Sequence, residues 1–337
     1  MNLKDSMKRL QKREHITQDE IFRRLDCTRS AMEKNSAEVQ TAFQLAFGTD
    51  NIFNSSKRSQ KSGESKELER FLPWARKFPI RALQKQGFVP TNIKDSDLVR
   101  AIFRFMNVGS IGGFNNYYDA TLHSPNPQTY AAWIRLGELC IKRSATEFTP
   151  NPETVLSNLK FLRKNIFLHG QGLRHIAREA LHNCGIEVIE IEPFLTAPIP
   201  TCAFYWRGYQ PIIQFPTTKM DDSRFLEALF HAVAHVLYHP LRTSCLQLGP
   251  SAQAPTQNNA TTAPSILETE AEQFAQDNLL SEAEECELIC CGHFSERRCI
   301  QHFSGLFHVR PGILVERLQQ QGKVNRRSPL NDFKIAV

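Results

Sequence analysis

The sequence has no long apolar run. No segment approaches the roughly 18 uninterrupted apolar residues of a membrane-spanning helix. The amino-terminal stretch MNLKDSMKRLQKREH is charged and has no apolar run behind it that would serve as a secretion signal. Hydrophobic residues make up 41% of the chain and charged residues 23%, which is the composition of a soluble globular protein. We therefore expect a cytoplasmic protein with no membrane partner.

The sequence also lacks a strong charge of either sign and a paired cysteine framework. A formal net charge of +6 over 337 residues permits an anionic partner without requiring one. There are nine cysteines, an odd number, and most lie far apart in a chain without a secretion signal. We expect reduced thiols rather than disulfide bonds.

Length and patterning predict a mostly helical α+β protein of about two units. Residues 1–54 have the pattern of short helices, residues 55–67 that of a polar linker, and residues 68–148 that of a helical middle region. From residue 149 the pattern changes to helices alternating with strand-like runs. Residues 149–337 are therefore predicted to form a second domain with a small β-sheet and a helical C-terminal part.

Three strand-like runs, GIEVIEIEPF, TCAFYWRG and QPIIQFP, are separated by proline and glycine. The last of them could pair with an extended substrate backbone, as edge strands do. The stretch 249–265 is low in complexity. In the middle region, five aromatic residues are expected to be core residues rather than ligand contacts: Trp74, Phe78, Phe103, Phe105 and Trp133.

Residues 1–54 contain a degenerate helix-turn-helix pattern. Thr17 is placed as the N-cap of a first helix, a brief break follows at Asp26 and Cys27, and a second helix begins at Thr28. The glycine or other small residue that is usual in such a turn is absent. The pattern is therefore compatible with DNA binding but does not establish it.

Few long polar side chains are available on the second helix for reading bases. They are Arg29, Glu33 and Lys34, of which Arg29 and Lys34 are the candidate DNA contacts. Two interpretations stay open. Residues 1–54 either bind DNA or form a small helical bundle used for packing or dimerisation.

Two histidines lie four residues apart in the stretch FHAVAHVLYHP. Because residues at this spacing share a face of a helix, His231 and His235 can turn both imidazoles towards one metal ion. The zinc-peptidase pattern H-E-x-x-H has a glutamate after the first histidine, and Ala232 stands at that position. The stretch is therefore either a metal site that lacks the usual base or an ordinary helix with two hydrogen-bonded histidines, and the pair alone does not decide between them.

A catalytic zinc needs a third protein ligand and one open position for water. The helix predicted over residues 266–280 supplies Glu268, with Glu272 one turn later, where it could orient a histidine by a hydrogen bond. Glu270 is the rival ligand, and it is less favoured because its neighbour four residues on is the apolar Phe274.

Two further residues near the end of the histidine helix are possible site residues. His239 lies four residues after His235, as His235 lies four residues after His231, and could suggest a three-histidine site. Because it precedes Pro240 at the helix end, capping of free carbonyls is the favoured role. Tyr238 could stabilise an oxyanion or simply be packed.

The motifs follow one another in a characteristic order. FHAVAHVLYH precedes ETEAEQFAQDNLL; before them stand WARKFPIRALQKQGFV, FRFMNVGS and YAAWIRLGE, and after them PGILVERLQQQG. In these stretches the sequence resembles the ImmA/IrrE family of zinc metallo-endopeptidases, specifically the larger members with an N-terminal XRE-type helix-turn-helix. The resemblance covers nearly the whole chain and is most specific from 68 to 337. It implies a zincin-like peptidase domain over 149–337 and Zn²⁺ as the cofactor.

The resemblance also implies residue roles. His231 and His235 match the two histidine ligands, Glu268 matches the third ligand, and Glu272 falls where Asp or Asn is usual. Ala232 departs from the family pattern, because the glutamate expected there takes a proton from water and passes it to the leaving amine. Losing a general base removes a factor of roughly 10²–10⁴ in rate, so we expect a nearly inert protein that still binds zinc.

The alanine has two explanations. An otherwise intact site favours an engineered substitution, whereas the degenerate helix-turn-helix pattern and Glu272 favour a natural pseudopeptidase. The corresponding functions are a zinc endopeptidase, silenced by Ala232, that acts on a regulatory protein such as a repressor or antitoxin, and a non-catalytic DNA-associated regulator or partner-binding pseudopeptidase.

The C-terminal region carries a cluster of metal-binding residue types that invites a second zinc site. Its spacing lacks a clean C-x-x-C pair, so thiols without metal are favoured over a structural zinc. The residues are Cys286, Cys290, Cys291, His293, Cys299 and His302. The run HVRPGILVERLQQQGKV predicts a turn followed by a helix with proline at its first position, used for packing.

Overall fold

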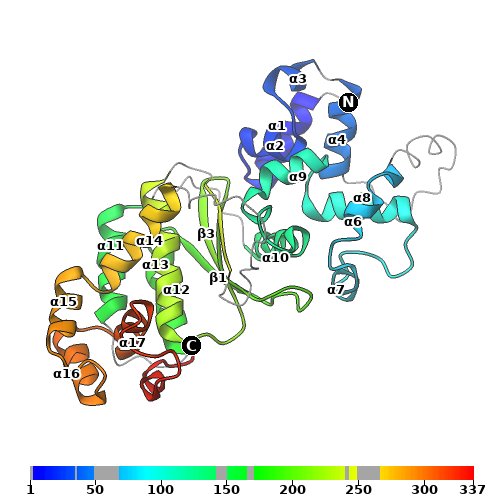
Figure 1. The fold of residues 1–337 in the computed structure, drawn as a ribbon. Coiled ribbons are helices and arrows are strands. Elements are labelled where there is room, and N and C mark those ends of the chain that lie inside the picture. The colour runs from blue at the N-terminus through cyan, green and yellow to red at the C-terminus, as the bar shows by residue number, and fades with distance from the viewer. Residues whose placement is uncertain are drawn as a thin grey trace. The chain divides into compact units, whose positions relative to one another are not determined.

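The fold of the computed structural model is mostly helical, with one four-stranded mixed β-sheet (Figure 1), which confirms the predicted α+β class. The structure describes residues 3–34, 36–48, 68–141, 150–164, 171–239, 243–248 and 266–337. The predicted linker 55–67 and the low-complexity stretch 249–265 lie outside these residues. Among the described helices, none combines the length and apolarity needed to cross a bilayer.

The chain divides into two compact units. The first consists of Met1–Glu147, Pro193–Ile199 and Arg207–Tyr209, and the second of Phe148–Glu192, Pro200–Trp206 and Gln210–Val337. The first unit thus includes Pro193–Ile199 and Arg207–Tyr209, which lie within the range 149–337 predicted as a second domain. The regions predicted separately as 1–54 and 68–148 belong to one unit.

The first unit begins with four short helices around an apolar core. They are α1 (Leu3–Glu14), α2 (Gln18–Leu25), α3 (Arg29–Glu33) and α4 (Ala37–Phe47). The side chains of Thr17, Thr28 and Ser36 cap α2, α3 and α4 by accepting backbone N–H groups of the first turn, which confirms the predicted cap at Thr17. Ile21 and Leu25 of α2 are buried in the core of this bundle.

An aromatic cluster forms the core of the rest of the first unit. The helices here are α6 (Leu72–Ala75), α7 (Ile80–Lys85), α8 (Asp95–Met106), α9 (Ile111–Tyr117), η1 (Asp119–Thr121) and α10 (Pro127–Cys140). The Trp74 ring stacks on Phe103 with centroids 5.1 Å apart and meets Phe114 edge-on at 5.3 Å. Four of the five aromatics predicted as core residues are buried, namely Phe78, Phe103, Phe105 and Trp133, and Trp74 is half-buried.

A buried ion network fastens α2 to the helices that follow. Arg24 donates hydrogen bonds to Glu20 Oε1 at 3.0 Å and to Glu138 Oε1 at 2.9 Å, and its guanidinium lies 3.5 Å from the Tyr117 ring centroid. Arg135 donates to the other oxygen of Glu138 at 2.6 Å. Because each charge has a partner, the network can stay buried and joins α2 to α10.

The sheet lies in the second unit, and its strand order corrects one expectation. The strands are β1 (Glu187–Ile191), β2 (Pro200–Arg207), β3 (Gln210–Pro216) and β4 (Cys245–Leu248), in the order β1-β3-β2-β4. β1 and β3 are parallel, and β2 and β4 are antiparallel. Since β3 lies between two strands, QPIIQF has no free edge for a substrate, and that expectation is wrong. The edge of β2 is covered by the chain's own β4.

The helices of the second unit share one apolar core with the sheet. They are α11 (Pro152–Lys164), α12 (Gln171–His182), α13 (Asp222–Tyr238), α14 (Ile266–Leu279), α15 (Glu282–Cys290), α16 (Arg297–Phe307), α17 (Pro311–Gln320) and η2 (Pro329–Phe333). The start of α17 confirms the predicted proline. Helices α13 and α14 pack against each other (Figure 1), which places the two predicted halves of the metal site side by side.

The start of α13 is fixed by two consecutive aspartates. Asp221 caps the helix by accepting a backbone N–H of its first turn. Asp222 is buried, where it accepts from the Arg310 guanidinium and from the backbone N–H of Ile335. A Cβ at Gly312 would lie 2.8 Å from the Asp222 carboxylate, so the close approach of α17 requires glycine there. These contacts set the position of the histidine helix.

Candidate metal centre

Two histidines of α13 converge as their spacing predicts. His231 and His235 are buried, and their Nε2 atoms lie 3.1 Å apart. The His235 ring stacks on Phe204 of β2 with centroids 5.8 Å apart and an interplanar angle of 20°. The sheet therefore holds the second histidine from one side while its Nε2 faces the first.

Glu268 comes from the first turn of α14. One of its carboxylate oxygens lies 3.2 Å from His231 Nε2 and the other 3.4 Å from His235 Nε2. Its side chain is 39% exposed, so this carboxylate forms the solvent side of the group. The structure thus brings together the three residues that the resemblance implies as ligands.

A fourth donor, Cys245, was not foreseen from the sequence. It opens β4 and pairs across the strands with Phe204, the residue that stacks on His235. Cys245 is 5% exposed. Its thiol belongs to one group with His231, His235 and Glu268, in which every donor atom lies within 4.8 Å of the others. The sequence signal for Cys245 as a donor is limited to its position ten residues after His235, at the start of a strand-like run.

The spacing of these donors suits a metal ion. In a tetrahedral site with ligands about 2.0–2.1 Å from the metal, neighbouring nitrogen and oxygen atoms lie about 3.3 Å apart. The observed separations between the nitrogen and oxygen donors are 3.1, 3.2 and 3.4 Å. The nitrogen and oxygen donors of α13 and α14 can therefore share a metal ion as they stand, and the Cys245 sulfur lies within 4.8 Å of each of them.

Burial and neighbouring groups shift the acidities of two donors in opposite directions. Burial by itself raises the pKa of Glu268, but hydrogen bonds from His231 and His235 outweigh it and lower that pKa below its usual range. Burial, followed by the charge of Glu268, raises the pKa of the Cys245 thiol. Since a metal binds the thiolate, loading of this group releases a proton.

His239 and Glu270 lie behind the metal group rather than at the positions expected for them. Nδ1 of His239 is 2.8 Å from Nδ1 of His235, and Nε2 of His239 is 3.2 Å from a carboxylate oxygen of Glu270. The expected use of the His239 side chain to cap carbonyls is therefore wrong. Glu270, the rival ligand, contacts His239 and is not among the four donors.

Three other predicted site residues are not among the donors. Ala232 is 0% exposed and belongs to the apolar core of the second unit. Glu272 is exposed and interacts with Gln276, so its expected hydrogen bond to a ligand histidine is wrong. Tyr238 is exposed and packs on the Phe274 ring at 5.5 Å, which favours the packing role over oxyanion stabilisation.

The C-terminal cysteines form two pairs instead of a second metal group. The Sγ atoms of Cys291 and Cys299 are 3.2 Å apart, and those of Cys286 and Cys290 are 3.9 Å apart. Within the described ranges, the only set of three or more potential ligands is the one around His231. All nine cysteines are free thiols.

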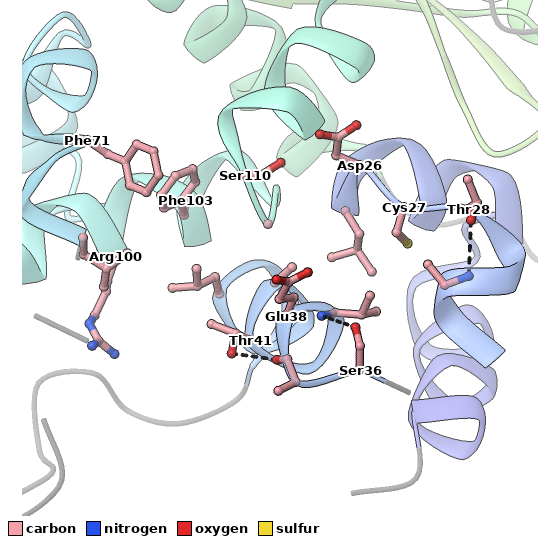
Figure 2. Close-up of a pocket in the computed structure, with 18 of the residues that line it drawn as sticks. Asp26, Cys27, Thr28, Ser36, Glu38, Thr41, Phe71, Arg100, Phe103 and Ser110 are labelled. Atoms are coloured by element: carbon pink, nitrogen blue, oxygen red, sulfur yellow. Dashed lines mark hydrogen bonds between the residues drawn. The ribbon is translucent and has the colours of Figure 1, made fainter. Parts of the chain in front are cut away.

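The helix-turn-helix-like region carries a cavity of about 660 Å³ (Figure 2). Phe71 and Phe103 form one wall and Ser110 lies near the turn between α2 and α3. Arg29 and Lys34 do not line it. Arg29 instead forms an exposed ion pair with Glu33, at 3.5 Å, on a helix of only five residues.

Comparison of the chain with known protein families, with curated proteins and with solved structures finds no match. The proposed function therefore depends on the geometry of the donor group.

Proposed function

We propose that this protein is a zinc-binding pseudopeptidase, in which the metal site of a zincin-type peptidase has become a closed site without hydrolytic chemistry. The observation that carries the proposal is Cys245, a fourth donor beside His231, His235 and Glu268. Ala232 supports it, because no carboxylate is available at the position of the general base.

The chemistry of the donors favours zinc. Two imidazoles, one thiolate and one carboxylate form a mixed set of nitrogen, sulfur and oxygen ligands, which a borderline-soft ion accepts. Mg²⁺ and Ca²⁺ take oxygen ligands and are poorly served by this set. Zn²⁺ is also four-coordinate and tetrahedral in sites where the protein supplies every ligand.

A closed site has a different use from an open one. Catalytic zinc sites keep one position for water, whereas structural sites fill all four positions with side chains. Here Cys245 supplies the ligand that would fill the remaining position. The bound metal would cross-link α13, β4 and α14, and so stabilise the second unit as a platform for a protein partner in regulation.

Endopeptidase activity is the second candidate function. It is favoured by the three donors that the two packed helices contribute, His231, His235 and Glu268, in the order of the zinc-peptidase pattern. The substrate would be a regulatory protein such as a repressor or antitoxin. Cleavage would need both a base at position 232 and release of the position that Cys245 fills.

DNA binding through residues 1–54 stays a hypothesis for the regulatory role. The short α3 and the Arg29–Glu33 ion pair favour the alternative, a helical bundle used for packing. The buried Arg24 network supports the same alternative, since α2 is fixed to α10 within one unit.

Cobalt substitution tests the closed site. The full chain loaded with Co²⁺ is expected to show a thiolate-to-cobalt charge-transfer band in the near ultraviolet and strong visible bands of a four-coordinate ion. Cys245→Ser should remove the charge-transfer band, and Cys202→Ser, at a buried thiol on the neighbouring strand β2, should keep it. A chain that binds no metal, or a band that survives Cys245→Ser, would overturn the proposal.

A further inference from the structure

The ligand His235 is the first member of a hydrogen-bonded chain that leads away from the metal group. Its Nδ1 lies 2.8 Å from Nδ1 of His239, and the Nε2 of His239 lies 3.2 Å from Glu270. The His239 side chain is 1% exposed and that of Glu270 is 59% exposed. This series of hydrogen bonds therefore runs from the buried donor group to the surface of α14.

One arrangement of protons satisfies every hydrogen bond in this series when a metal is bound. A metal on Nε2 of His235 leaves the proton of that ring on Nδ1. That N–H donates to the lone pair on Nδ1 of His239, so the neutral His239 ring carries its proton on Nε2. The second N–H then donates to the carboxylate of Glu270, which needs no proton of its own.

The contacts of His239 fit neither of its other possible roles, which are helix capping and metal ligation. Its two ring nitrogens are engaged by His235 and Glu270 and are not used to cap the carbonyls of α13. It also lies outside the four-donor group.

We propose that His239 and Glu270 are positioning residues that fix the tautomer and the ring orientation of the ligand His235. The proposal rests on the proposed metal site and adds its outer layer. Metal-bound histidines usually donate their second N–H directly to a carboxylate or a carbonyl. Here an imidazole stands between the ligand and the carboxylate, and Glu270 acts on the metal site through two hydrogen bonds.

Variants of Glu270 test the proposal in the full chain. Loss of an outer hydrogen-bond partner lowers metal affinity about 10-fold to 100-fold, and we expect about 10-fold for Glu270→Ala because Glu270 is largely exposed. Glu270→Gln keeps an acceptor oxygen and should recover most of the affinity. Glu272→Ala, at an exposed position on the same helix, is the matched control and should bind as the unmodified chain does. Zinc affinity is measured by competition with a chromophoric chelator.

A spectroscopic readout separates positioning from general stability. In the Co²⁺-loaded chain, the exchangeable Nδ1–H proton of His235 gives a hyperfine-shifted NMR signal. Glu270→Ala should move this signal and speed its exchange with solvent, whereas Glu272→Ala should leave it in place. Because Glu270 lies at the surface, its variants keep the test decisive even where a His239→Leu variant fails to fold.

The possible results have distinct meanings. Weaker zinc binding and a changed His235 signal in Glu270→Ala alone support the positioning role. If the unmodified chain binds zinc and Glu270→Ala changes neither the zinc affinity nor the His235 signal, the positioning role is overturned. The proposed metal site is then unaffected. If the unmodified chain binds neither Zn²⁺ nor Co²⁺, the proposed function fails and the positioning role fails with it.

Discussion

Nε2 of His231 lies 3.1 Å from Nε2 of His235, and a carboxylate of Glu268 faces both atoms. Two neutral imidazoles placed in this way direct lone pairs at each other unless a proton or a cation lies between them. One metal ion satisfies both nitrogens and the carboxylate together. This relationship is the physical basis of the predicted metal binding.

One equivalent of zinc should bind per chain and stabilise it. Binding to the folded state alone adds about 4 kcal/mol to the free energy of unfolding when free zinc is about 1,000-fold above its dissociation constant. His235→Ala and Glu268→Ala should lose the metal and this stabilisation. Metal content by mass spectrometry and thermal unfolding with and without chelator measure the effect. Full zinc in Glu268→Ala, with loss in Glu270→Ala, would show that the ligand has been misassigned.

Zinc should protect Cys245 from alkylation. A thiolate bound to metal is withdrawn from reaction, while the exposed Cys286 should be modified at the same rate with and without zinc. Peptide mapping after a timed exposure to iodoacetamide under mildly denaturing conditions gives both rates in one sample. Equal rates at Cys245 in the zinc-loaded and zinc-free chain would argue that its sulfur is not a ligand.

Ala232→Glu alone should not create a protease. The zinc-peptidase pattern has a glutamate at this position, but the structure places Ala232 in the core, where an unpaired carboxylate costs on the order of 3 kcal/mol of stability. Cys245 would also still fill the fourth position. The double variant Ala232→Glu, Cys245→Ala removes the second obstacle.

Candidate partner proteins should be incubated with the single and double variants, with a chelator as control. If the chain derives from an active endopeptidase, the double variant should gain roughly 10²–10⁴ in cleavage rate over Cys245→Ala. Cleavage by Ala232→Glu alone would contradict the closed site. The absence of cleavage in the folded, zinc-loaded double variant favours the binding function.

Glu138 should make the first unit sensitive to acid. Burial raises its pKa, but Arg24 and Arg135 outweigh burial and, with a hydrogen bond from Tyr117, lower the pKa from 4.5 to about 2. Because the folded-state pKa is the lower one, the stabilisation is complete above about pH 4.5 and is lost as the pH falls through about 2. A shift of this size corresponds to on the order of 3 kcal/mol.

The acid effect is measured on Glu138→Gln. Urea unfolding should show a loss of on the order of 3 kcal/mol near pH 7 and a smaller loss near pH 3. Glu33→Gln, at an exposed glutamate of α3, is the control and should unfold like the unmodified chain. A constant difference between Glu138→Gln and the unmodified chain at all pH values would contradict the assigned network.

DNA contacts through α3 should be weak. Substitution of Arg29 or Lys34 by alanine should leave the affinity of the full chain for duplex DNA, and its dependence on salt, unchanged if this region only packs. A phosphate contact would instead appear as a salt slope lower by about one for each charge removed. Fluorescence anisotropy over a salt titration decides between the two interpretations.

The local features of the molecule were determined by sequence. Helix period and stop signals predict α13 and its end before Pro240, and the four-residue spacing places His231 and His235 on one face. The cap at Thr17 and the proline that begins α17 were predicted in the same way. Interactions over three or four residues produce these features, so a short window of sequence contains the information.

Tertiary structure alone decided the fourth donor and the outer partners of the site. Cys245 reaches the group because β4 pairs with β2 in a register that sets it opposite Phe204, and no local pattern fixes a register between distant strands. The same pairing covers the edge of β2. Likewise, the packing of α14 on α13 brings Glu270 to His239 and leaves Glu272 exposed. Helical period limits which residues share a face, but the angle between two packed helices decides which of them meet.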